Sequence, residues 1–79
     1  MERTRSFIAR WAEREFEIRL LCARDPTFRA TLEDYEEAAD AHAHWAAVAG
    51  PADQRTNDFH EIVEELEREL LARLGPMTG

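Results

Sequence analysis

The chain has 79 residues, a net charge of −7 and an apolar fraction of 44%, with only three Gly and three Pro, which excludes a disordered tail. A chain of this length forms a single domain, over residues 1–79, with a small core and a thin margin of stability. No apolar run is long enough to cross a bilayer, and residues 1–5 lack the apolar core of a signal peptide, so we expect a cytoplasmic protein without membrane contact.

The first expected helix covers about residues 4–23 and is apolar on two opposite sides. One side holds Phe7, Trp11, Ile18 and Cys22, and the other holds Ala9, Phe16, Leu20 and Ala23. A helix with two apolar sides needs two partners, so we expect one side to pack on the rest of the chain and the other on a second copy. Cys22 is expected to be a small buried thiol, since a lone cysteine forms no internal disulfide.

The second expected helix covers about residues 26–49. Asp25 is a suitable N-cap, and Pro26 fits the first helical position, where no amide donor is needed. Residues 31–34 offer a weaker alternative start. Gly50, followed by proline, is expected to end the helix because glycine tolerates the left-handed cap.

The third expected helix covers about residues 53–74 and ends before Gly75. Its start is left open, because Asp53, Thr56 and Asn57 each suit the N-cap position.

Apolar side chains in the last two helices repeat at the spacing of a coiled-coil seam. The first stripe contains Phe28, Leu32, Tyr35, Ala39, His42, Ala46 and Ala49, and the second contains Phe59, Val63, Leu66, Leu70 and Leu74. Pairing Phe28 with Leu74 and Leu32 with Leu70 keeps the sum of residue numbers constant, which is the register of an antiparallel pair. The sequence therefore predicts an all-α fold of three helices, an antiparallel helical hairpin plus an N-terminal helix, in a dimeric bundle.

The histidines suggest a ligand or pH-sensitive site but no metal centre within one chain. His42 and His44 point to opposite sides of one helix and cannot chelate a common ion. His60 lies at nearly the level of His42, yet helix handedness indicates opposite flanks of the seam, so we expect no joint site; a site across a dimer stays open. Protonation of His42 below about pH 6 is expected to loosen the hairpin. We expect no cofactor.

An enzyme is not expected, because Ser6 is the only serine and no glycine-rich phosphate loop is present. Arg3, Arg10 and Arg14 share one flank of the first helix, a pattern found in nucleic-acid-binding proteins. The strongly acidic remainder of the chain repels phosphate, which disfavours a nucleic-acid partner.

Residues 25–28 (Asp-Pro-Thr-Phe), followed by Leu32, Tyr35 and a Glu-rich helix over residues 64–70, resemble the small bacterial helical hairpins of the YdcH-like family. The resemblance covers about residues 25–74 and implies a hairpin of unknown function. The chain departs from the family in its acidic last helix, where lysines are typical, and in its additional first helix.

We expect a non-enzymatic protein–protein interaction module of a bacterial cytoplasm, forming a homodimer or higher oligomer or docking on a larger bacterial protein. The expected interaction residues are Phe7, Trp11, Phe16, Ile18, Leu20 and Trp45. One alternative is a metal- or ligand-binding helical protein with a site at a dimer interface that includes His42 and His60. A second alternative is a small nucleic-acid-associated regulator that uses the arginines of the first helix.

Overall fold

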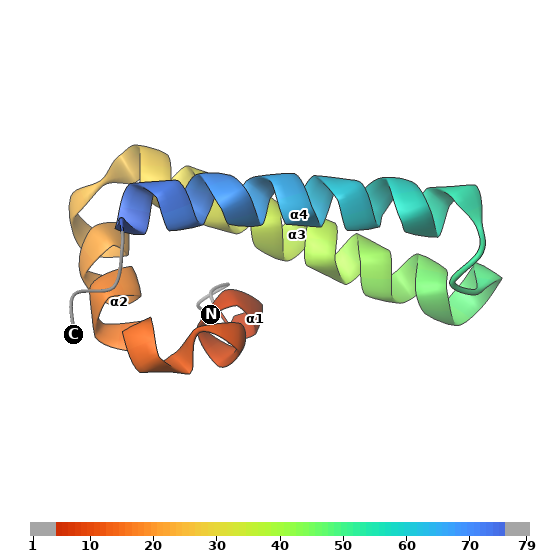
Figure 1. Cartoon of the computed structure of the whole chain (residues 1–79), viewed down its shortest axis with the longest axis horizontal. Helices are drawn as coiled ribbons and strands as arrows, with labels where there is room; N and C mark the ends of the chain where they lie inside the picture. The colour runs from red at the N-terminus through yellow and green to blue at the C-terminus, as the bar shows by residue number, and fades with distance from the viewer. Residues whose placement is uncertain (1–4, 76–79) are drawn as a thin grey trace.

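A computed structural model describes residues 5–75, and this part of the chain is all-α, as the sequence predicts. It contains α1 (Arg5–Arg10), the 3₁₀ helix η1 (Ala12–Arg14), α2 (Glu15–Arg24), α3 (Pro26–Ala49) and α4 (Gln54–Leu74). The long helices α3 and α4 lie side by side and run in opposite directions, and α1, η1 and α2 fold against the end where α3 begins and α4 finishes (Figure 1). None of the described helices combines the length and apolar character needed to span a membrane.

Local chemistry sets both ends of α3. The Asp25 carboxylate accepts hydrogen bonds from the backbone N–H groups of Thr27 (3.0 Å) and Phe28 (3.2 Å), which caps the first turn. Gly50 follows the last turn at a φ of +92°, and its N–H donates to the carbonyl of Ala46. This positive φ is accessible to glycine at little cost and explains why the helix stops there.

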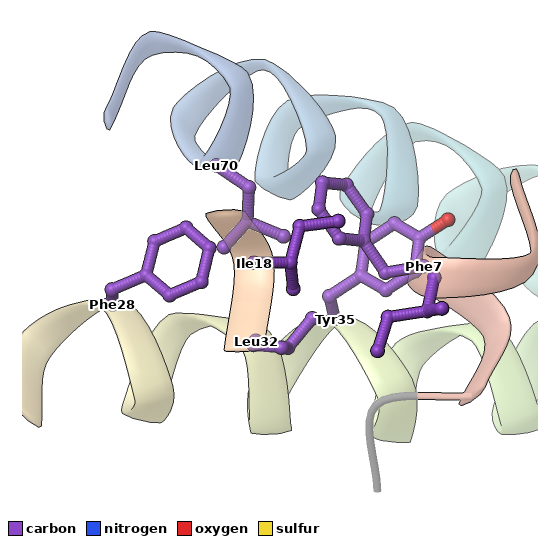
Figure 2. Packing of buried hydrophobic residues seen from close by; sticks show 7 residues of the cluster. Phe7, Ile18, Phe28, Leu32, Tyr35 and Leu70 are labelled. Atoms are coloured by element: carbon purple, nitrogen blue, oxygen red, sulfur yellow. The ribbon is translucent and has the colours of Figure 1, made fainter. Parts of the chain in front are cut away.

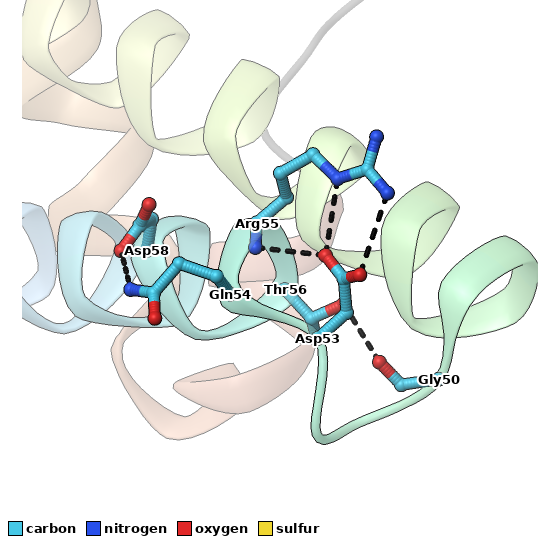
Figure 3. Close-up of polar contacts among 6 residues, drawn as sticks. All are labelled: Gly50, Asp53, Gln54, Arg55, Thr56 and Asp58. Atoms are coloured by element: carbon cyan, nitrogen blue, oxygen red, sulfur yellow. Dashed lines mark hydrogen bonds and ion pairs between the residues drawn. The ribbon is translucent and has the colours of Figure 1, made fainter.

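The turn into α4 is closed by side chains (Figure 3). Asp53 is the N-cap and accepts from the backbone N–H of Arg55 at 2.9 Å and from its guanidinium at 3.0 Å. The buried hydroxyl of Thr56 donates to the carbonyl of Gly50 at 2.9 Å. Of the possible caps in the sequence, Asp53 therefore caps the helix, whereas Thr56 links the first turn of α4 to the end of α3 by a hydrogen bond.

The first expected helix is not continuous, so the prediction of one helix over about residues 4–23 is wrong; residue 4 itself lies outside the described residues. The backbone leaves the helical region at Trp11, with φ −122° and ψ 49°, and η1 separates α1 from α2. In a straight helix Phe7 and Ile18 would lie about 16 Å apart along the axis. The break allows both side chains to enter one cluster (Figure 2).

That hydrophobic cluster lies between the α3–α4 pair and the N-terminal segment. Its fully buried members are Phe7, Ile18, Phe28, Leu32 and Leu70, joined by Ile8 and Tyr35. The rings of Phe7 and Tyr35 meet edge to face with centroids 5.3 Å apart. In α3 the last buried residue toward the turn is Ala38, so the apolar core occupies only the half of the α3–α4 pair that the N-terminal segment covers.

Candidate functional site

Two of the six expected interaction residues lie inside the chain's own core. Phe7 and Ile18 are fully buried between the N-terminal segment and the α3–α4 pair. They occupy the side of the N-terminal segment that covers the core, so no partner protein can reach them. The expectation that they contact a partner is therefore wrong.

The opposite side of α2 faces outward. Phe16 is 79% exposed and Leu20 is 38% exposed, and the two lie one helical turn apart. Ala23 is also exposed and follows on the same side of the helix. We call Phe16, Leu20 and Ala23 the α2 patch. Phe16 is the most exposed large apolar side chain of the described residues, and Leu20 adjoins it on the same side of the helix, so the α2 patch is the strongest candidate for an interaction surface.

The two tryptophans lie apart from this patch. Trp11 is half-buried against the core cluster, and its indole Nε1 is buried without a hydrogen-bond partner among residues 5–75. Trp45 is half-buried near the far end of α3, where the guanidinium of Arg55 lies 4.0 Å from the ring centroid and His44 contacts the ring edge. Arg55 thus covers one face of the Trp45 ring by a cation–π contact within the chain, so less of the ring is accessible to a partner protein.

His42 and His60 come together, contrary to the expectation from helix handedness. Their ring centroids are 5.4 Å apart and the ring planes are inclined by 42°. The prediction that the two histidines lie on opposite flanks of the seam is therefore wrong. His60 Nε2 also lies 3.5 Å from Glu64 Oε1, whereas His44 is exposed on another side of α3.

No group of three or more His, Cys, Asp or Glu side chains within residues 5–75 is arranged to hold a metal ion. Cys22 is half-buried against the core cluster instead of fully buried.

Two buried polar groups attach the N-terminal segment to the long helices, and the sequence pattern did not reveal either. Glu36 is 4% exposed and accepts from the backbone N–H groups of Ser6 (3.2 Å) and Phe7 (2.9 Å). These bonds are made to the start of α1, where N–H groups lack helical partners. The connection spans about 30 residues of chain, and no local spacing rule detects it.

Arg14 is the second of these groups. Its buried guanidinium donates to Glu17 at 2.9 and 3.2 Å and to the carbonyl of Leu74, at the end of α4, at 3.3 Å. The hydrogen bond with Glu17 raises the pKa of Arg14, and the same bond lowers the pKa of Glu17. Arg14 therefore joins η1 to both α2 and the end of α4.

These contacts also bear on the arginines that suggested nucleic-acid binding. Arg14 is engaged as described, and Arg10 pairs with Glu67 of α4 at 3.0 Å. Arg3 lies outside the described residues. Because two of the three arginines are committed to carboxylates of the same chain, their flank offers little free positive charge to phosphate.

A shallow hollow of about 540 Å³ lies between α3 and α4. It is lined by Asp34, Glu37, Ala38, Phe59, Ile62 and Leu66. The acidic residues of this lining come from α3 and its large apolar residues from α4, but the hollow is wide open to solvent and has no convergent polar groups of the kind that orient a small molecule.

No protein-family model, curated protein or solved structure matches this chain. The surfaces of the chain itself, the α2 patch and the His42–His60 pair, are therefore the basis for assigning a function.

Proposed function

We propose that this chain is a non-enzymatic protein–protein interaction module that forms a twofold homodimer through α2. In this proposal α3 and α4 act as an antiparallel hairpin that supports the N-terminal segment, and the α2 patch is the contact surface. The observation that carries the proposal is the exposure of Phe16 (79%) and Leu20 (38%) on one side of a helix whose other side is held in the core.

The order of residues along α2 favours a second copy as the partner. When two α2 helices pack antiparallel about a twofold axis, the residue numbers of every facing pair add up to the same total. In the register that places Phe16 of one copy on the small Ala23 of the other, Glu15, which already pairs with Arg19 of its own chain at 2.8 Å, also meets Arg24. A large side chain then fills the space over a small one, and opposite charges are brought together at each end of the contact.

The contact area offered by the α2 patch is small, so we expect a dimer that dissociates on dilution. Sedimentation velocity or light scattering over a wide range of concentration measures this directly. Phe16→Ser is expected to yield a monomer at concentrations where the wild type is dimeric. Because Phe16 is mostly exposed, the substitution leaves the core intact and the melting temperature of the monomer nearly unchanged.

Val48→Ser is the matched control, since Val48 is 66% exposed but lies on α3, far from the patch. This variant should dimerise like the wild type. A mass that is unchanged in Phe16→Ser, or reduced equally in Val48→Ser, would contradict the proposal.

The register is tested by charge exchange. Glu15→Arg and Arg24→Glu should each weaken the dimer, because each places like charges opposite one another. The double variant should recover dimerisation. If the double variant is as weak as the single ones, the α2 helices do not meet in this register.

A further inference from the structure

The His42–His60 pair lies immediately beyond the hydrophobic cluster. Ala39 and Val63 are half-buried, pack against the cluster and lie three residues from His42 and His60 in sequence, and no residue of α3 between Ala39 and the turn is fully buried. His42 is half-buried and the His60 side chain is 56% exposed, so water and dissolved ions reach the pair. Two imidazoles from different helices therefore meet where the apolar core gives α3 and α4 little support.

The spacing of the rings fits a shared metal ion. A Zn–N bond of about 2.0–2.1 Å places the centroid of a coordinating imidazole about 3.2 Å from the ion, so two imidazoles on one tetrahedral ion have centroids about 5.2 Å apart. The observed separation is 5.4 Å. The separation of the two ring centroids therefore matches that expected for two imidazoles on one ion.

We propose that His42 and His60 bind one divalent transition-metal ion, such as Zn²⁺, and that the ion bridges α3 and α4. Imidazole nitrogens suit Zn²⁺, Cu²⁺ and Ni²⁺ and are poor ligands for Mg²⁺ and Ca²⁺. Water completes the coordination shell, since no third side chain of the described residues joins the pair. The net charge of −7 adds a general attraction for cations.

Glu64 has a positioning role in this site. Its carboxylate lies 3.5 Å from Nε2 of His60, one turn further along α4. A carboxylate that accepts the N–H of one imidazole nitrogen orients the ring and makes the other nitrogen a better ligand.

The full chain, without a histidine tag, provides the test. Titration with Zn²⁺ in a calorimeter should give one ion per chain, and saturating Zn²⁺ should raise the melting temperature by about 5 °C or more, because the ion binds the folded state. EDTA should reverse the rise. Mg²⁺ at the same concentration should cause no shift.

Variants separate a metal site from two rings that are merely in contact. His60→Gln should abolish the Zn²⁺-dependent shift while melting near the wild-type temperature without metal, because His60 is more than half exposed. Glu64→Gln should weaken Zn²⁺ binding about tenfold. His44→Gln is the matched control and should retain both the binding and the shift.

Three results would overturn the proposal: no Zn²⁺-dependent shift, a shift that persists in His60→Gln, or one ion shared by two chains.

Discussion

The carboxylate of Glu36 accepts a hydrogen bond of 2.9 Å from the backbone N–H of Phe7, which precedes it by 29 residues. A second bond from the N–H of Ser6 makes this carboxylate the acceptor for the free N–H groups at the start of α1. The helix has only six residues and is too short to be stable alone. Its position therefore depends on Glu36 and on the burial of Phe7.

Replacing Glu36 by alanine should consequently destabilise the fold. Two N–H groups lose their acceptor in a buried place, which costs about 1–3 kcal/mol of unfolding free energy. Glu36→Gln retains one acceptor oxygen and should lose less. Urea unfolding measures both, with Glu37→Ala as the exposed neighbouring control; equal stability of Glu36→Ala and the control would show that the contact contributes nothing.

The indole of Trp11 leads to a different expectation. Its Nε1 is buried and has no partner among residues 5–75, so the ring contributes apolar packing at the cost of an unsatisfied donor. Trp11→Phe removes the donor and keeps most of the aromatic contact, and we expect a change within about 1 kcal/mol, in either direction. Trp11→Ala removes the packing as well and should cost about 2–4 kcal/mol. A large loss in Trp11→Phe, measured by urea unfolding, would mean that the indole N–H has a partner.

The turn between α3 and α4 depends on the hydrogen bond from Thr56 to the carbonyl of Gly50. Thr56→Val has nearly the same shape but leaves that carbonyl with only the longer hydrogen bond from the backbone N–H of Asp53, at 3.3 Å, so we expect a loss of about 1 kcal/mol. Thr56→Ser keeps the hydroxyl and is the control. Thermal unfolding should rank the variants wild type, Ser, Val; a valine variant as stable as the wild type would show that the bond from Thr56 does not stabilise the turn.

The sequence predicts well those features that depend on interactions between residues close together in the chain. The ends of α3 at Asp25 and Gly50 were predictable because capping chemistry acts within a few residues. The two-sided character of the first segment correctly separates the exposed Phe16 from the buried Ile18.

Long-range geometry escaped the sequence pattern. The break at Trp11 arises because the segment must bend to bring two side chains into one cluster, and no glycine or proline marks it. The acceptor role of Glu36 and the approach of His42 to His60 depend on how separate helices are placed. Residue spacing within one helix does not predict contacts between separate helices. The antiparallel register of the two long helices did, however, place the two histidines at nearly the same level of the hairpin.

Two carboxylates should make the stability of the chain decrease at low pH. Hydrogen bonds from Arg14 lower the pKa of Glu17, and hydrogen bonds from the side chain and backbone of Arg55 lower the pKa of Asp53. Both groups therefore bind protons more readily in the unfolded chain than in the folded one. Their stabilising contribution is complete above the ordinary carboxyl pKa values of about 4 and is lost as the pH falls through the lower values of the folded state.

We accordingly expect these two groups to leave the melting temperature unchanged from about pH 6 to pH 5 and to lower it steadily from there to about pH 2.5. Glu17→Gln and Asp53→Asn should each melt lower than the wild type at pH 6 and should show a shallower decline below pH 4. Glu33→Gln, a substitution at an exposed position of α3, is the control and should follow the wild-type curve. Because Arg14 remains protonated throughout this range, a steeper decline in Glu17→Gln would mean that another carboxylate has taken its place beside the guanidinium.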